Sequence, residues 1–204
     1  MFYDYKKEGI WQLGEEAAAA ANGQEPGDIK VQDVDGNGVI TTDDRIIYSQ
    51  RPDVTFGFNN TFNYKGFDLS VFLYARLGQW IAYDYNTTYR INALENGGNV
   101  DYWTPENPTN AFPRPNKSKS YTQVTYYSTL KYEDGSFFKI RDITLGYTFK
   151  PELLKHLNLS RLRVYATAKN FFTFSKIDNY DPEQGGSISF PMTKQLVFGL
   201  NVEF

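Results

Sequence analysis

The sequence predicts an antiparallel all-β fold whose strands form part of the wall of a transmembrane outer-membrane β-barrel. Three observations support this prediction. Apolar and polar residues alternate along segments of about 9 to 11 residues, the length that a tilted strand needs to cross a bilayer. Short and long connections alternate between these segments. The chain also ends on an alternating strand whose last residue is aromatic.

The first two strands are expected at residues 54–64 and 67–77. In the first, apolar side chains share one face with the single interruption of Asn60, and the opposite face is polar or glycine. Lys65-Gly66 predicts a tight turn between them, so the two segments form a hairpin. The apolar rows consist of Val54, Phe56, Phe58, Phe62 and Tyr64, followed by Phe67, Leu69, Val71, Leu73, Ala75 and Leu77.

Three further strands are expected at residues 137–149, 162–172 and 196–204. The pattern of the first is weaker in its first half, because Lys139 and Arg141 are expected on the face that later carries apolar residues. Both faces of the second strand hold apolar residues. The terminal strand would place its apolar row in lipid and its last aromatic at the interface. This C-terminal row, which suits barrel assembly, consists of Leu196, Phe198, Leu200, Val202 and Phe204.

Connection lengths predict which ends of the strands lie outside the cell. The connections 65–66 and 150–161 are short, whereas 78–136 and 173–195 are long. Outer-membrane barrels have short periplasmic turns and long extracellular loops. We therefore expect residues 1–53 and the two long connections to be extracellular, with residues 54–204 supplying the barrel strands. The segment Pro151 to Leu157 is expected to form a short helical turn, because proline suits the first helical position.

Composition excludes several classes of protein. With 41% hydrophobic and 17% aromatic residues among 204, the chain is too apolar for a disordered segment. It contains no cysteine, which excludes a disulfide scaffold, and its net charge of -3 argues against binding to nucleic acid. The chain holds one histidine, His156, and lacks a Gly-rich phosphate loop, so we do not expect an enzyme. Met1 is not followed by a secretory signal, so we expect that the natural N-terminus is missing.

One segment has the spacing of a calcium loop. Residues 33–44 place oxygen-bearing residues at positions 1, 3, 5, 9 and 12 of a twelve-residue loop, and Gly38 lies where the chain must turn sharply. Position 12 is aspartate rather than glutamate, which would weaken bidentate binding. The alternative is an Asp/Asn/Gly-rich surface turn without an ion. The candidate Ca²⁺ ligands are Asp33, Asp35, Asn37, the Val39 carbonyl, Thr41 and Asp44.

The long connection 78–136 is the candidate loop for contact with a ligand or a partner. Aromatic rings stack on sugar rings or pack against proteins, and the neighbouring amides can bond hydroxyl groups. The alternative is that these rings pack the loop against itself. The candidate contact residues are Trp80, Tyr83, Tyr85, Tyr89, Tyr102 and Trp103.

Several short motifs follow one another along nearly the whole chain. Each is weak alone, but the ordered set is specific. The set consists of Pro26-Gly27-Asp28-Ile29, Asp33-Val34-Asp35-Gly36-Asn37-Gly38, Pro52-Asp53-Val54-Thr55-Phe56-Gly57, Tyr64-Lys65-Gly66-Phe67-Asp68-Leu69, Trp103-Thr104-Pro105-Glu106-Asn107-Pro108, Glu133-Asp134-Gly135-Ser136-Phe137, Leu145-Gly146-Tyr147, Leu162-Arg163-Val164-Tyr165, Lys169-Asn170-Phe171-Phe172-Thr173 and Tyr180-Asp181-Pro182-Glu183.

With these motifs, the chain resembles the C-terminal part of the SusC/RagA family of TonB-dependent outer-membrane transporters of Bacteroidetes. The resemblance implies a large barrel with an N-terminal plug that imports glycans or peptides using energy relayed by the TonB complex. It also implies a SusD-like surface lipoprotein as a lid over the extracellular loops. The plug domain is absent from these residues. Five strands cannot close a barrel that needs about 22, so the isolated chain should form an open curved sheet without transport activity.

A second class of protein fits the same pattern. Alternating strands and aromatic loops also occur in secreted β-sandwich modules that bind carbohydrate and hold a structural calcium. The two interpretations differ in where the apolar rows lie. A sandwich buries them against a second sheet, whereas a barrel wall leaves them exposed on its convex face.

Overall fold

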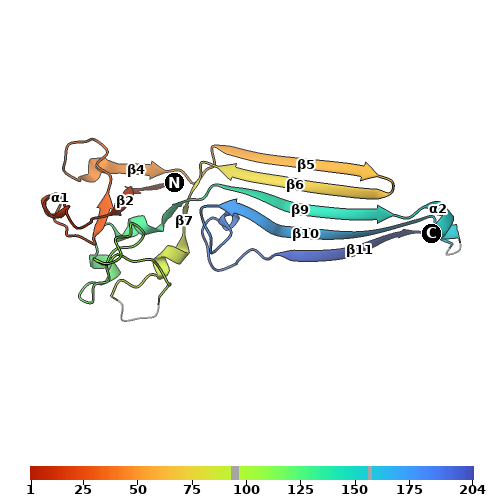
Figure 1. The fold of residues 1–204 in the computed structure, drawn as a ribbon. Helices are drawn as coiled ribbons and strands as arrows, with labels where there is room; N and C mark the ends of the chain where they lie inside the picture. The colour runs from red at the N-terminus through yellow and green to blue at the C-terminus, as the bar shows by residue number, and fades with distance from the viewer. Residues whose placement is uncertain (93–96, 156–157) are drawn as a thin grey trace. The chain divides into compact units, whose positions relative to one another are not determined.

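The structure is a computed structural model that describes residues 1–92, 97–155 and 158–204. The described residues form two compact units (Figure 1). Unit 1 comprises Met1–Arg51, Trp80–Asp134 and Gly185–Ile188, and unit 2 comprises Pro52–Gln79, Gly135–Gln184 and Ser189–Phe204. All five strands expected from residue 54 onward belong to unit 2, whereas most of the long connection 78–136 folds with the N-terminal segment in unit 1. Within the described ranges, no helix has the length and apolar character needed to cross a membrane.

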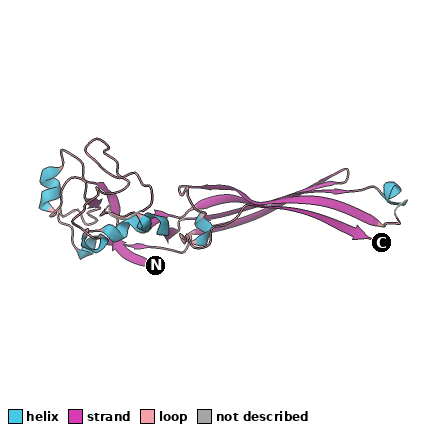
Figure 2. Cartoon of the chain, turned by 90° about the horizontal axis from the view of Figure 1, so that it is seen from below, coloured by secondary structure: helices cyan, strands magenta, loops and turns pink. Residues whose placement is uncertain are grey.

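Unit 2 is built on a five-stranded antiparallel sheet with the order β11-β10-β9-β6-β5. Figure 2 shows that these long strands twist along their length, as strands in β-sheets normally do. The strands run over β5 Val54–Tyr64, β6 Phe67–Leu77, β9 Phe137–Thr148, β10 Arg161–Ser175 and β11 Gln195–Glu203.

The hairpin of β5 and β6 has the bounds that the alternation predicts. Its ladder runs without interruption from Val54 opposite Leu77 to Tyr64 opposite Phe67. Both turn residues have positive φ, 47° at Lys65 and 89° at Gly66. This is the requirement of the two-residue turn whose twist matches the flanking strands.

The strand β9 corrects one expectation. Lys139 does not share a face with the later apolar residues, because the ladders to both neighbouring strands shift register beside Arg141. Lys139 lies opposite Tyr74 on β6, while Ile143 lies opposite Val71. A bulge inserts one extra residue and reverses the alternation beyond it. The apolar face of the sheet is therefore continuous along the whole of β9.

Among the described residues, the helix α2 (Pro151–Leu154) and the 3-10 helix η6 (Pro182–Gln184) lie in the connections between strands of this sheet. The expected helical turn is present as α2, Pro151–Leu154, with proline in its first turn. Leu154 is buried, whereas Leu153 is exposed, so the two leucines do not share a buried face. His156 and Leu157, the end of the expected turn, lie outside the described residues. The 3-10 helix η6, Pro182–Gln184, lies in the connection between β10 and β11.

Unit 1 packs short elements around a small apolar core. Its central cluster consists of Ile10, Ile29, Val31, Trp103 and Leu130. Paired strands surround this cluster, β1 with β4, β2 with β3, and β7 with β8. The elements are β1 Phe2–Tyr5, β2 Lys7–Ile10, α1 Glu16–Ala21, β3 Ile29–Val31, η1 Thr42–Asp44, β4 Arg45–Tyr48, β7 Trp80–Ala82, η2 Asp84–Thr88, η3 Tyr121–Gln123, η4 Tyr127–Lys131 and β8 Tyr132–Asp134.

Candidate functional site

One face of the five-stranded sheet is apolar and exposed. Phe62 on β5 is 61% exposed, Leu145 on β9 is 50% exposed and Leu200 on β11 is 68% exposed. Aromatic residues gather near the turn between β5 and β6, where the rings of Phe67 and Tyr147 lie 4.7 Å apart. A β-sandwich would bury such a row, so the exposed face favours a sheet surrounded by lipid. The terminal row expected for barrel assembly, Leu196, Phe198, Leu200, Val202 and Phe204, is likewise exposed.

The opposite face of the sheet is polar and carries paired charges. Arg163 on β10 donates to Asp68 on β6 through Nε at 2.8 Å. These two strands are not neighbours, because β9 lies between them. The ion pair therefore passes over Gly146 of β9, where a Cβ atom would come within 2.5 Å of the Arg163 guanidinium and of the Asp68 carboxylate. A glycine at this position leaves room for a charge pair that crosses a strand.

A fully buried lysine lies on the same polar face. The Lys139 side chain has no exposed area, and its Nζ lies 2.6 Å from Asp181 and 2.8 Å from Glu183. Both carboxylates belong to the connection between β10 and β11. Sequence reasoning missed this cluster, because the alternation pattern placed Lys139 on the wrong face. The one available signal was the break in alternation at Lys139 and Arg141, since such a break is typical of a bulge.

The calcium-loop residues converge in part. Carboxylate oxygens of Asp33, Asp35 and Asp44 all lie within 4.8 Å of one another. Asp33 accepts hydrogen bonds from the N–H groups of Gly36 at 2.8 Å and Gly38 at 2.7 Å, which folds the loop into a ring. Three hard oxygen donors at this separation are the kind of set that Ca²⁺ prefers.

Two further candidate ligands of this loop, Asn37 and Thr41, make local hydrogen bonds through their side chains. The Asn37 side chain donates to Asp35 at 2.8 Å and accepts from the Val39 N–H at 2.8 Å. The Thr41 hydroxyl oxygen accepts from the Asp43 N–H at 3.2 Å.

Asp44 closes the loop from within the fold. It is fully buried and accepts from the N–H groups of Thr41 at 2.7 Å and Val34 at 2.8 Å. The hydrogen bond from Thr41 is the main reason that the pKa of Asp44 lies below its ordinary value. These hydrogen bonds hold the Asp44 carboxylate in place at the end of the loop.

Three of the six candidate contact aromatics of the long connection lie inside the fold. Tyr83, Tyr89 and Trp103 are buried. The Trp103 indole donates to Gln12 at 2.8 Å, and the Tyr89 hydroxyl donates to the Pro113 carbonyl at 2.9 Å. These rings pack unit 1 internally. Trp80 and Tyr85 are half-buried, and Tyr102 is 43% exposed.

Comparisons with known proteins agree with a sheet that has one apolar and one polar face. The chain is 31% identical over its full length to TonB-dependent receptor P3 of Formosa agariphila, and 31% identical over 84% of its length to TonB-dependent receptor SusC of Bacteroides thetaiotaomicron. It covers 22% of the first protein and 17% of the second. The RagAB peptide transporter superposes on the whole chain with a TM-score of 0.72 and 25% identity, and the chain covers 23% of that transporter chain. No family model matches.

The fold and its relatives define a class of protein. An antiparallel sheet whose apolar face is exposed and whose opposite face is polar is typical of the wall of a membrane β-barrel. The chain is homologous to the SusC/RagA-like TonB-dependent receptors and corresponds to about a fifth of such a receptor, with 22% and 17% of the two named receptors covered. These relatives are named as receptors and transporters rather than as enzymes. The resemblance inferred from the sequence motifs is confirmed.

Proposed function

We propose that this chain forms barrel wall and extracellular structure of an outer-membrane receptor that imports nutrients. One observation carries the proposal, namely that every strand of the sheet has exposed apolar side chains on one face while paired charges line the other. The exposed apolar side chains include Phe62, Phe67, Leu145, Phe172 and Leu200. A sheet of this kind is stable only with hydrocarbon on one side and an aqueous lumen on the other. The remaining strands would come from other parts of the receptor, since the sheet has free edges at β5 and β11.

The same proposal includes the imported nutrient and the partner proteins of the receptor. The RagAB relative is a peptide transporter, and the sequence motifs resemble a family that imports glycans or peptides, so we propose an oligosaccharide or a peptide as the cargo. We assign a SusD-like surface lipoprotein as the lid and the TonB complex as the source of energy, acting through N-terminal parts of the receptor. The receptor would then be an integral protein of the Gram-negative outer membrane.

A structural calcium ion belongs to this proposal. The converging carboxylates of Asp33, Asp35 and Asp44 would hold it, supported by backbone N–H groups that orient two of them. A hard cation there would neutralise charges that otherwise repel one another and would fix the loop. Its function would be structural, since the chain contains one such loop and no long flanking helices.

Gene deletion tests the import function directly. In the bacterium that carries the gene, deletion of the complete receptor should abolish growth on one class of oligosaccharide or peptide and leave growth on monosaccharides intact. Cell fractionation should recover the receptor with the outer membrane. Recovery in the soluble periplasmic fraction, or unchanged growth on every oligosaccharide and peptide supplied, would contradict the proposal.

A further inference from the structure

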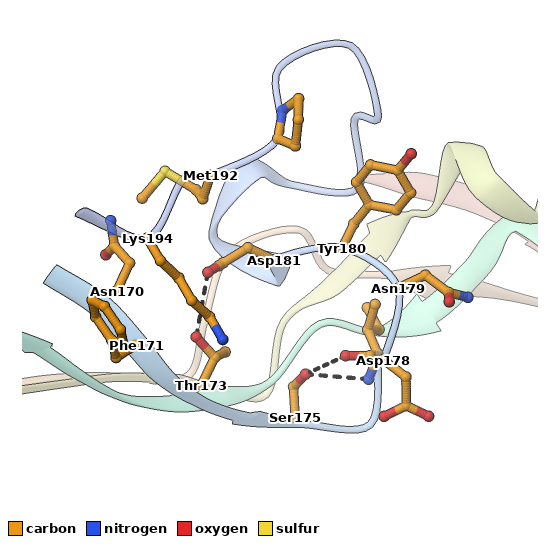
Figure 3. A pocket seen from close by; sticks show the side chains of 12 residues that line it. Asn170, Phe171, Thr173, Ser175, Asp178, Asn179, Tyr180, Asp181, Met192 and Lys194 are labelled. Atoms are coloured by element: carbon orange, nitrogen blue, oxygen red, sulfur yellow. Dashed lines mark hydrogen bonds between the residues drawn. The ribbon is translucent and has the colours of Figure 1, made fainter. Parts of the chain in front are cut away.

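A cavity of about 530 Å³ lies at one end of β10, within unit 2 (Figure 3). This volume is in the range of small-molecule sites, about 300 to 1,000 Å³. Its lining includes Asn170, Phe171, Thr173, Asp181, Met192 and Lys194. The register places Thr173 opposite Lys139, so the cavity opens on the polar face of the sheet. In the proposed receptor, this face of the sheet lines the lumen of the barrel.

A β-bulge forms one wall of the cavity. The ladder between β10 and β9 passes from Lys169 directly to Phe172, which leaves Asn170 and Phe171 unpaired. Asn170 has φ of 58°, the left-handed conformation that few non-glycine residues adopt. Its side-chain amide donates to the Thr193 carbonyl at 3.2 Å, which joins the bulge to the far end of the connection. Bulges are over-represented at the rims of barrels and next to functional sites, where they redirect side chains.

A buried ionic cluster fixes the second wall. Lys139, with no exposed side-chain area, holds both Asp181 at 2.6 Å and Glu183 at 2.8 Å. Thr173 adds a hydrogen bond to Asp181 at 3.3 Å, and Arg141 lies 3.1 Å from Glu183. Removing one partner of a buried charge cluster is strongly unfavourable, so the connection has one well-defined position on the sheet. The cavity is therefore built in advance of any ligand.

The chemistry of the lining favours an uncharged ligand rich in hydroxyl groups. Lys139 compensates the charge of Asp181. The lining carries one further carboxylate, Asp178, and one ammonium, Lys194, which lies 6.0 Å from the centre of the Phe171 ring. The cavity thus combines balanced charges with amide groups and with an aromatic face and a thioether. An aromatic face packs against the C–H groups of a sugar ring, while amides and carboxylates bond its hydroxyl groups.

We infer that this cavity is a sugar-binding subsite in the lumen wall, with Phe171 as its stacking platform and Lys139 as the residue that positions its second wall. The inference rests on the proposed import function and specifies it further, because it assigns neutral oligosaccharides rather than peptides as cargo. Phe171 contacts the ligand directly, whereas Lys139 acts through Asp181.

Calorimetric titration of the complete receptor, purified in detergent, tests the platform. The probes are a panel of short neutral oligosaccharides and a panel of short uncharged peptides. Phe171→Ala should weaken binding of the preferred oligosaccharide about tenfold, which is the loss of one aromatic contact of roughly 1.4 kcal/mol. Phe174→Ala is the matched control, since Phe174 lies on the same strand but is 58% exposed on the apolar face. It should leave binding unchanged.

Limited proteolysis tests the positioning residue. Lys139→Met should speed tryptic cleavage in the connection between β10 and β11 and weaken oligosaccharide binding, while the barrel stays folded as judged by its heat-dependent gel mobility. Lys169→Met is the control, because Lys169 forms an exposed ion pair on the same face, 3.5 Å from Asp142. Unchanged cleavage and binding in the folded Lys139→Met receptor would overturn the positioning role.

The outcomes also separate this inference from the proposed function. Binding of peptides but of no oligosaccharide, with import intact, would overturn the sugar subsite and leave the import function standing. Oligosaccharide binding that is equal in wild type and Phe171→Ala would overturn the location of the subsite. Absence of binding to both panels, together with unchanged growth of the deletion strain, would overturn the import function itself.

Discussion

Gly146 shows how much of the polar face depends on a single residue. Asp68 and Arg163 reach each other only because nothing occupies the space above this glycine on β9. Any larger residue must displace an ion pair or a backbone strand. The sequence gives no direct sign of this function, since the glycine becomes significant only when three strands are placed side by side.

Gly146→Ala should therefore destabilise the sheet. The new Cβ would lie 2.5 Å from the Arg163 guanidinium, so the ion pair must shift or break. We expect the free energy of unfolding to fall by about 1–3 kcal/mol. Urea unfolding of the receptor in lipid vesicles, followed by tryptophan fluorescence, measures this change.

Gly57→Ala on β5 is the control for this substitution. A Cβ atom at Gly57 would have its nearest contact at 3.6 Å from the Phe72 ring, an ordinary van der Waals distance. Its stability should stay close to that of wild type. Equal stabilities of the two variants would mean that the ion pair between Asp68 and Arg163 contributes nothing to the free energy of unfolding.

A single carboxylate, that of Asp35, tests the proposed calcium site. Asp35→Asn keeps one oxygen that can accept from the Asn37 N–H but removes one of the three converging charges. We expect calorimetric titration with CaCl₂ to show binding weakened at least about tenfold, since each lost charge–ion contact at close range is worth 1 kcal/mol or more. Asp43→Asn is the control, because Asp43 is exposed and outside the converging set. Wild-type receptor that binds no Ca²⁺ would rule out the site.

At the scale of elements, the hairpin of β5 and β6 shows how local sequence determines local structure. Clean alternation over 11 residues on each side fixes the register, because a shift of one residue would exchange the apolar and polar faces. The turn is less favourable, since Lys65 adopts a φ of 47° although lysine has no preference for the left-handed region.

Lys65→Asn should stabilise this hairpin. Asparagine tolerates the left-handed region, and Asn-Gly is the preferred pair for this type of turn. We expect the free energy of unfolding to rise by about 0.5–1 kcal/mol, measured by the same urea unfolding. Lys65→Ala provides the comparison, because it removes the same charge but does not favour the left-handed conformation at this position. A gain of equal size in both variants would attribute the effect to charge rather than to conformation.

Other elements were less accessible to sequence reasoning. The bulge beside Arg141 reverses the alternation of β9 through pairing with two neighbouring strands at once, and no local pattern fixes its position. For a related reason, the sequence did not show whether the aromatic residues of connection 78–136 bind a ligand or pack inside the fold. Rings such as Tyr89 and Trp103 suit a ligand surface and a core equally well, and only the surrounding chain decides which they form.

At the scale of the whole molecule, the medium on each side of the sheet is the central question. Leu200 and Asn201 are neighbours on β11 and point to opposite faces. Leu200→Arg should impair insertion into the outer membrane, at a cost of about 2–4 kcal/mol if the position is near the bilayer midplane. Asn201→Arg should insert normally, because its side chain faces the aqueous lumen. Outer-membrane yield of each receptor variant measures insertion, and equal yields would contradict a lipid-facing row.

The sequence by itself determined the all-β class, the positions of the main strands and the resemblance to the receptor family. These properties depend on local periodicity and on short ordered motifs, which are present in the chain before it folds. The tertiary structure decided which long-connection aromatics are buried, which face carries Lys139, and that Gly146 lies beneath an ion pair. Those features depend on contacts between segments distant in sequence. A linear pattern does not contain them, because register and bulges are fixed only when several strands pair together.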